Sequence, residues 1–166
     1  MGDLRALPSE MYAFKHLGLQ EKNKIKSEKE LMNECFGMVP EAIFKHPLNN
    51  KNISVEVKRI VGNKLPFEGG GRRLIRRRKH IIWPWKSTIE ASLDKINGDI
   101  VNKYSVSEHH VVIVVPENLS ERSHNRLLNH IQDSANNYFV NTSLSLKKNR
   151  IFIHVIKGNV NLFDRL

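Results

Sequence analysis

The chain has 166 residues, of which 40% are hydrophobic and 27% are charged, and its net charge of +10 is typical of a basic, soluble, globular domain. No apolar run approaches the roughly 20 residues that span a bilayer, and the N-terminus lacks the apolar segment of a secretory signal, so we expect a cytoplasmic or nuclear protein without membrane contact. The single cysteine, Cys35, excludes an internal disulfide and a cysteine-rich zinc site.

The first third of the chain predicts one helix and two strands. Residues 1–26 are expected to form a peripheral, weakly structured segment. Ser27 and Glu30 have the spacing of a capping box, which predicts a helix that begins near Ser27. Residues 42–46 are predicted to form a short strand. Residues 53–61 form the clearest strand, because apolar and polar side chains alternate along it.

The rest of the chain predicts alternating helices and strands. The predicted elements are a helix capped by Ser87 with apolar residues at Ile89, Leu93, Ile96 and Ile100, a buried strand over 110–115, a helix over 120–139 and a strand over 150–156. We therefore predict a single α/β domain over residues 27–166, with a mixed central β-sheet flanked by helices and a basic loop at 62–86.

The strand 53–61 carries the residues that favour catalysis. Alternate side chains of a strand lie on one face, so Glu56 and Lys58 lie together. If this face lines a cleft, Glu56 can hold a divalent cation, and Lys58 can orient water and stabilise charge on a phosphate. Phosphodiester hydrolysis requires such neutralisation. The alternative is an ordinary solvated strand face.

A hard cation usually takes more than one oxygen ligand, so a second acid is needed. The nearby acids are Glu41, which follows Pro40, Glu30 and Glu34 on the preceding helix, and Glu68 in the glycine-rich loop.

Pro40-Glu41 followed by Glu56-Val57-Lys58 resembles the motif of the PD-(D/E)XK nuclease superfamily. The later order of helix, strand, helix and strand is similar to the common core of that superfamily. The resemblance covers most of the predicted domain, but its specific part is only five residues. It implies a restriction-endonuclease-like core.

The resemblance also implies roles for individual residues. Glu41 and Glu56 would bind Mg²⁺ or Mn²⁺, Val57 would add its backbone carbonyl as a metal ligand, and Lys58 would assist the attacking water. Glu34 is the candidate for an accessory acid. The first acid of the family is usually Asp, and this chain has Glu41 at that position. The alternative is therefore a chain that keeps the fold of the family but has a degenerate site.

The basic loop indicates a polyanionic partner. Residues 72–80, RRLIRRRKH, hold five arginines and one lysine without an acid, whereas a solvated surface usually mixes charges of both signs. The tryptophans that follow can stack on bases or pack in the core. The predicted nucleic-acid-binding residues are Arg72, Arg73, Arg76, Arg77, Arg78, Lys79, Trp83, Trp85 and Lys86.

Other catalytic motifs are missing from the sequence. His109 and His110 are adjacent and point to opposite faces of a strand, and no HExxH spacing, nucleophile elbow or Walker loop is present. The sequence therefore predicts a Mg²⁺- or Mn²⁺-dependent endonuclease that acts on DNA rather than RNA, as a homodimer or as a subunit of a larger complex. The alternatives are a non-catalytic nucleic-acid-binding module and a structural subunit whose basic loop contacts an acidic protein.

Overall fold

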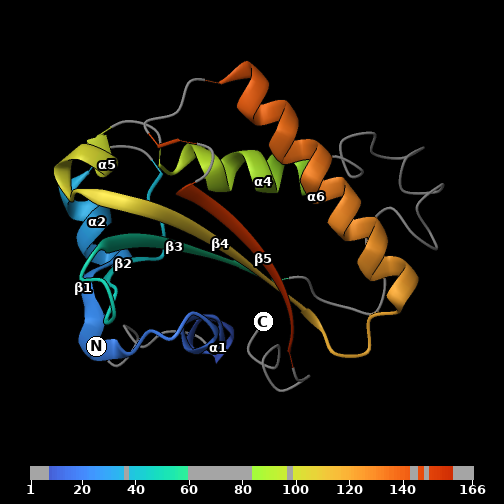
Figure 1. Ribbon diagram of the computed structural model, residues 1–166, viewed down its shortest axis with the longest axis horizontal. Helices are drawn as coiled ribbons and strands as arrows, with labels where there is room; N and C mark the ends of the chain where they lie inside the picture. The colour runs from blue at the N-terminus through green and yellow to red at the C-terminus, as the bar shows by residue number, and fades with distance from the viewer. Residues whose placement is uncertain are drawn as a thin grey trace.

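The structure is a computed structural model that describes residues 8–35, 38–59, 84–96, 99–142, 146–147 and 150–158. Within them a five-stranded mixed sheet has the order β1-β2-β3-β4-β5 (Figure 1). Its strands are β1 (Lys24–Ser27), β2 (Ala42–Lys45), β3 (Asn52–Arg59), β4 (Val106–Pro116) and β5 (Ile151–Gly158). The first three strands pair antiparallel, and β3, β4 and β5 pair parallel.

Helices cover both faces of the sheet. They are α1 (Pro8–His16), the short 3-10 helix η2 (Glu21–Asn23), α2 (Glu28–Glu34), α4 (Pro84–Asp94), α5 (Asp99–Lys103) and α6 (Glu121–Asn141). Figure 1 shows α1 on one side of the sheet and α4 with α6 on the other. The architecture is a single α/β domain, as the sequence predicted.

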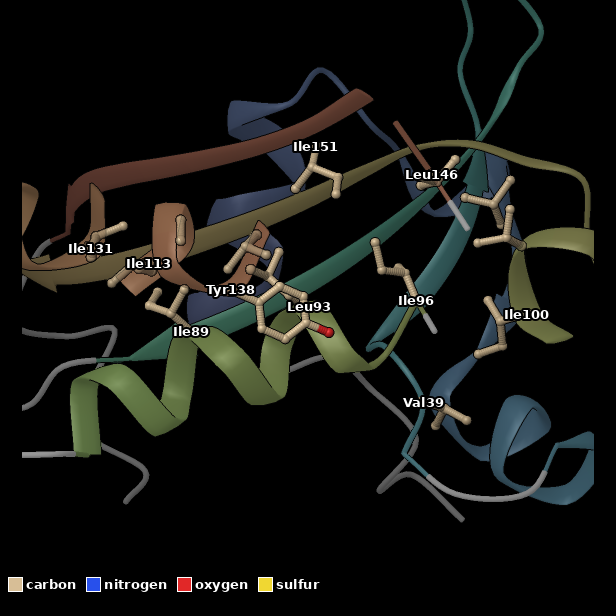
Figure 2. Close-up of a cluster of buried hydrophobic side chains, with 14 of the residues drawn as sticks. Val39, Ile89, Leu93, Ile96, Ile100, Ile113, Ile131, Tyr138, Leu146 and Ile151 are labelled. Atoms are coloured by element: carbon tan, nitrogen blue, oxygen red, sulfur yellow. The ribbon is translucent and has the colours of Figure 1, made fainter. Parts of the chain in front are cut away.

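Two apolar clusters fill the space between the sheet and these helices. The larger one lies under α4 and α6 and includes Leu93, Ile113 and Tyr138 (Figure 2). The smaller one lies under α1 and includes Phe14 and Phe44. A sheet with both faces covered is buried on both sides, which explains why the second half of β4, residues 111–115, is a continuous run of buried β-branched residues.

The strand β3 differs from its neighbours on the side that faces α4. Among the described residues, β2, β4 and β5 each contribute side chains to the larger cluster, whereas β3 contributes none. Its apolar side chains Ile53, Val55 and Val57 all lie in the smaller cluster, under α1. The side that faces α4 instead carries Ser54 and Glu56, both 0% exposed. A polar row is therefore buried where an apolar one would ordinarily stabilise the core.

Most of the predicted elements are confirmed. Ser27 caps α2 through a capping box with Glu30, because the Ser27 hydroxyl accepts a hydrogen bond from the Glu30 amide and the Glu30 carboxylate accepts one from the Ser27 amide. Ser120 caps α6 in a similar way, through the Ser123 amide. The strands β2, β3, β4 and β5 all lie where the hydrophobic patterns predicted them, with ends that differ by a few residues.

Three local predictions are wrong. The segment 8–26 is not peripheral, because α1 buries Ala13 and Phe14 against the sheet and β1 pairs with β2. Ser87 does not cap α4, which already begins at Pro84. Ile100 does not continue α4, because a separate helix, α5, begins at Asp99. Only the first of these differences is explained by tertiary packing, whereas proline at the first position of α4 is a local start signal.

Candidate active site

The carboxylate of Glu56 lies at the centre of the buried polar row. Its side chain is 0% exposed, and its Oε2 forms an ion pair with Nζ of Lys95, which lies in the turn after α4. Within the described part of the chain, no group other than Lys95 donates a hydrogen bond to this carboxylate. A buried carboxylate costs several kcal/mol unless charge compensates it. The Lys95 ammonium compensates part of that cost, and Oε1 keeps acceptor capacity.

Lys95 was not predicted as a site residue. Its side chain is 14% exposed, so the ion pair is nearly enclosed. The sequence contains a weak signal, because Ser92 and Lys95 are three residues apart beside the apolar positions Leu93 and Ile96. Residues three apart lie on one side of a helical turn, so this spacing places two polar residues next to a buried stripe.

Glu41 lies close to Glu56, on the chain just before β2. Its amide donates to the carbonyl of Val55, the residue that precedes Glu56 on β3. Burial raises the pKa of the Glu41 carboxyl to about 10, helped by a hydrogen bond to Glu28 and by the negative charges of Glu56 and Glu10. The structure therefore brings together the two acids that the sequence paired, and it holds Glu41 protonated when no cation is present.

The acid that contacts Glu41 is Glu28, and not Glu34, which the sequence proposed as the accessory acid. Glu34 lies at the opposite end of α2, about 9 Å further along the helix axis. Its carboxylate accepts hydrogen bonds from Lys26 at 2.8 Å and from the Tyr104 hydroxyl at 2.9 Å, and the hydrogen bond from Lys26 lowers the pKa of Glu34. These contacts hold Glu34 away from the two candidate ligands.

The other two residues of the motif lie on β3 beside Glu56. Lys58 shares the face of Glu56 and is partly exposed, so it lies toward the open end of this face. The side chain of Val57 is buried under α1, so only its backbone carbonyl could serve as a ligand. The predicted role of Lys58 is untested, and Lys95 is the lysine that contacts Glu56.

The predicted nucleic-acid-binding residues cannot be related to this site. Arg72, Arg73, Arg76, Arg77, Arg78, Lys79 and Trp83 lie outside the described residues. Trp85 and Lys86 lie in the first turn of α4, but their side chains are outside what the structure describes.

The acids present fit a metal ion only in part. Among the residues described, no group of three or more His, Cys, Asp or Glu side chains is arranged to hold a metal ion. Glu41 and Glu56 offer hard oxygen donors, and Mg²⁺ is often held by one or two carboxylates with water and substrate phosphate completing its shell. Oε1 of Glu56, which has no hydrogen-bond partner in the described part of the chain, fits such a role.

No described helix is long and apolar enough to cross a membrane. Comparisons of the chain with protein-family models, with curated proteins and with solved structures give no match.

Proposed function

We propose that this chain hydrolyses phosphodiester bonds of nucleic acid, DNA rather than RNA, with Mg²⁺ or Mn²⁺ bound by Glu41 and Glu56 on a restriction-endonuclease-like core. One observation carries the proposal. A carboxylate that is 0% exposed, paired with a lysine through Oε2 and without a hydrogen-bond partner at Oε1 in the described chain, lies beside a second acid. A carboxyl with a strongly raised pKa, as Glu41 has, that lies beside other charged groups is a candidate for function.

The sheet supports the same proposal. After β3 the described chain runs through α4 and α5 to β4, and then through α6 to β5. Apart from the second helix α5, this order is similar to the helix, strand, helix and strand order of the common core of PD-(D/E)XK nucleases. The acid pair lies at the strand that begins this order, where the resemblance also expects it.

The residues of the site would have different roles in the reaction. The metal, when bound, supplies positive charge that neutralises the phosphate and acidifies a water molecule. Glu41 and Glu56 orient that charge. Lys95 would hold the Glu56 carboxylate in place, because its ammonium contacts Oε2. Lys58, which is partly exposed on the same face of β3, would contact the phosphate or the attacking water. The basic residues of 72–80 would bind the phosphates of the substrate backbone.

A second function has a specific observation in its favour. Glu41 has a pKa raised to about 10, and the described residues include no group of three metal-binding side chains. A protonated Glu41 is a poor ligand for a cation, so the chain could instead be a nucleic-acid-binding module that does not cut. A metal ion reverses this protonation only if its binding free energy exceeds the cost of removing the proton.

Cleavage of plasmid and single-stranded DNA in Mg²⁺, Mn²⁺ or EDTA separates the two functions. The variant Glu56→Gln removes the charge of the buried ligand at almost constant volume, and Glu117→Gln makes the same change at an exposed position of the strand exit. We expect metal-dependent cleavage that Glu56→Gln abolishes and Glu117→Gln retains. Salt-sensitive binding without cleavage in any metal would refute the nuclease and leave the binding module.

A further inference from the structure

A second buried polar group lies beside the Glu56–Lys95 pair. The Ser54 hydroxyl on β3 is 2.7 Å from Nδ1 of His109 on β4, and Nε2 of His109 is 3.0 Å from the carbonyl oxygen of Ser92 on α4. All three residues are 0% exposed. One imidazole therefore connects two neighbouring strands and the helix that covers them.

The hydrogen-bond partners of His109 determine which of its ring nitrogens carries the proton. A carbonyl oxygen only accepts hydrogen bonds, so Nε2 must carry the hydrogen that it donates to Ser92. Nδ1 is then the acceptor, and the Ser54 hydroxyl donates to it. Burial lowers the pKa of His109 to about 3, which keeps the ring neutral at ordinary pH. Both ring nitrogens are used inside the core, so His109 is not placed to touch a substrate.

The connection joins the two halves of the ion pair. Ser54 precedes Glu56 by two residues on β3 and lies on the same face. Ser92 precedes Lys95 by three residues, which places both on one side of the helix end. The positive charge of Lys95 also contributes to the lowered pKa of His109. The imidazole thus bridges the strand that carries Glu56 and the helix that precedes Lys95.

We propose that His109 is a positioning residue for Lys95, holding its ammonium against Glu56 through the Ser54–His109–Ser92 connection. An apolar side chain of similar size would fill the same space, but it would not fix the rotation and height of α4 over β3. Directional hydrogen bonds supply that constraint. The placement of Lys95 does not depend on the proposed nuclease function, whereas its consequence for cleavage rests on that function.

The first test measures Lys95 directly, without any activity. In ¹⁵N-lysine-labelled protein, an enclosed and paired ammonium exchanges its protons slowly enough to give its own NMR signal, and Lys95→Arg assigns that signal. We expect the signal to disappear in His109→Leu, which removes both hydrogen bonds, and to remain in His109→Gln, whose amide can donate to Ser92 and accept from Ser54. His124→Leu, on the partly exposed side of α6, is the matched control and should leave the signal unchanged.

Far-UV circular dichroism shows whether each variant is folded. If His109→Leu does not fold, Ser54→Ala serves instead, because it removes one hydrogen bond and leaves the imidazole in place. A folded His109→Leu or Ser54→Ala protein with an unchanged Lys95 signal would overturn the proposal. Loss of the signal in His109→Gln as well would also overturn it, because the effect would then belong to the ring and not to its hydrogen bonds.

The second test uses cleavage and a double-mutant cycle. We expect His109→Leu to reduce metal-dependent cleavage by about 10- to 100-fold, as for other residues that orient a metal site. The same substitution in a Lys95→Gln background should cause no further loss, because Lys95 is the residue through which His109 acts. Equal losses in both backgrounds would refute the positioning role. If the native protein cuts nothing while the Lys95 signal behaves as expected, the proposed function fails and the positioning of Lys95 stands.

Discussion

Replacing Lys95 with methionine should destabilise the fold strongly, because it leaves a buried carboxylate without its countercharge. Glu56 is 0% exposed, and Lys95 is the cation that contacts it. Breaking a buried ion pair by removing one partner costs about 3–5 kcal/mol. The Lys95 side chain keeps 14% exposure, so we expect the lower end, about 3 kcal/mol. For a chain of this size that corresponds to a decrease in Tm of about 6–12 °C.

Urea denaturation followed by circular dichroism measures this free energy. Lys58→Met is the matched control, because it removes the same charge from a partly exposed position of the same polar face and should change stability by less than about 0.5 kcal/mol. Adding Glu56→Gln to Lys95→Met should recover most of the lost stability, because the uncompensated charge is gone. A cost below about 1 kcal/mol for Lys95→Met, or no recovery in the double variant, would refute the view that Glu56 is a buried charge held by Lys95.

Three further predictions concern pH, metal ions and salt. The pKa of His109 is about 3 in the folded protein and about 6.5 in the unfolded chain, so the folding stability that depends on the neutral imidazole is complete above pH 6.5 and is lost as the pH falls. The titration of His109 should make the protein about 2 kcal/mol less stable at pH 5 than at pH 8. Urea titrations of His109→Gln should lack this part of the pH dependence. Mn²⁺ at 100 times its Kd should stabilise the native protein by about 2.7 kcal/mol in thermal denaturation, and the same stabilisation in Glu41→Gln would exclude Glu41 as a ligand. Replacing the arginines 76–78 by alanine should reduce the slope of log K against log salt for duplex DNA by about 3, and an unchanged slope would show that the basic loop does not contact phosphates.

Local sequence patterns were sufficient for most elements of the fold. The capping box at Ser27 and Glu30 depends on neighbouring backbone groups, and the hydrophobic periods of β3 and α6 depend on which face is buried. These signals lie within a few residues of the element that they predict, so they can be recognised without knowing which other elements pack against it. The prediction for the segment 8–26 was wrong because α1 is only weakly amphipathic, so its sequence gives little sign of a helix. This helix is stabilised by packing on the sheet.

In the candidate site, too, the sequence predicted some features and not others. The sequence paired Glu41 with Glu56, because an acid after Pro40 and an acid on a strand are visible as a motif. The sequence also placed Lys58 on the face of Glu56, which follows from strand geometry. It could not show that this face is buried, because Ser54 and Glu56 are as polar as residues on a solvated face.

The sequence by itself determined that this protein is a basic α/β domain with an amphipathic strand that carries Glu56 and Lys58. Only the tertiary structure decided that α4 closes over that strand, that Lys95 and not Lys58 contacts Glu56, and that Glu28 and not Glu34 approaches Glu41. The physical reason is that secondary structure follows local periodicity, whereas these contacts join residues from separate elements. Their distances depend on the packing of the core and on the hydrogen bonds of His109, which no local pattern contains.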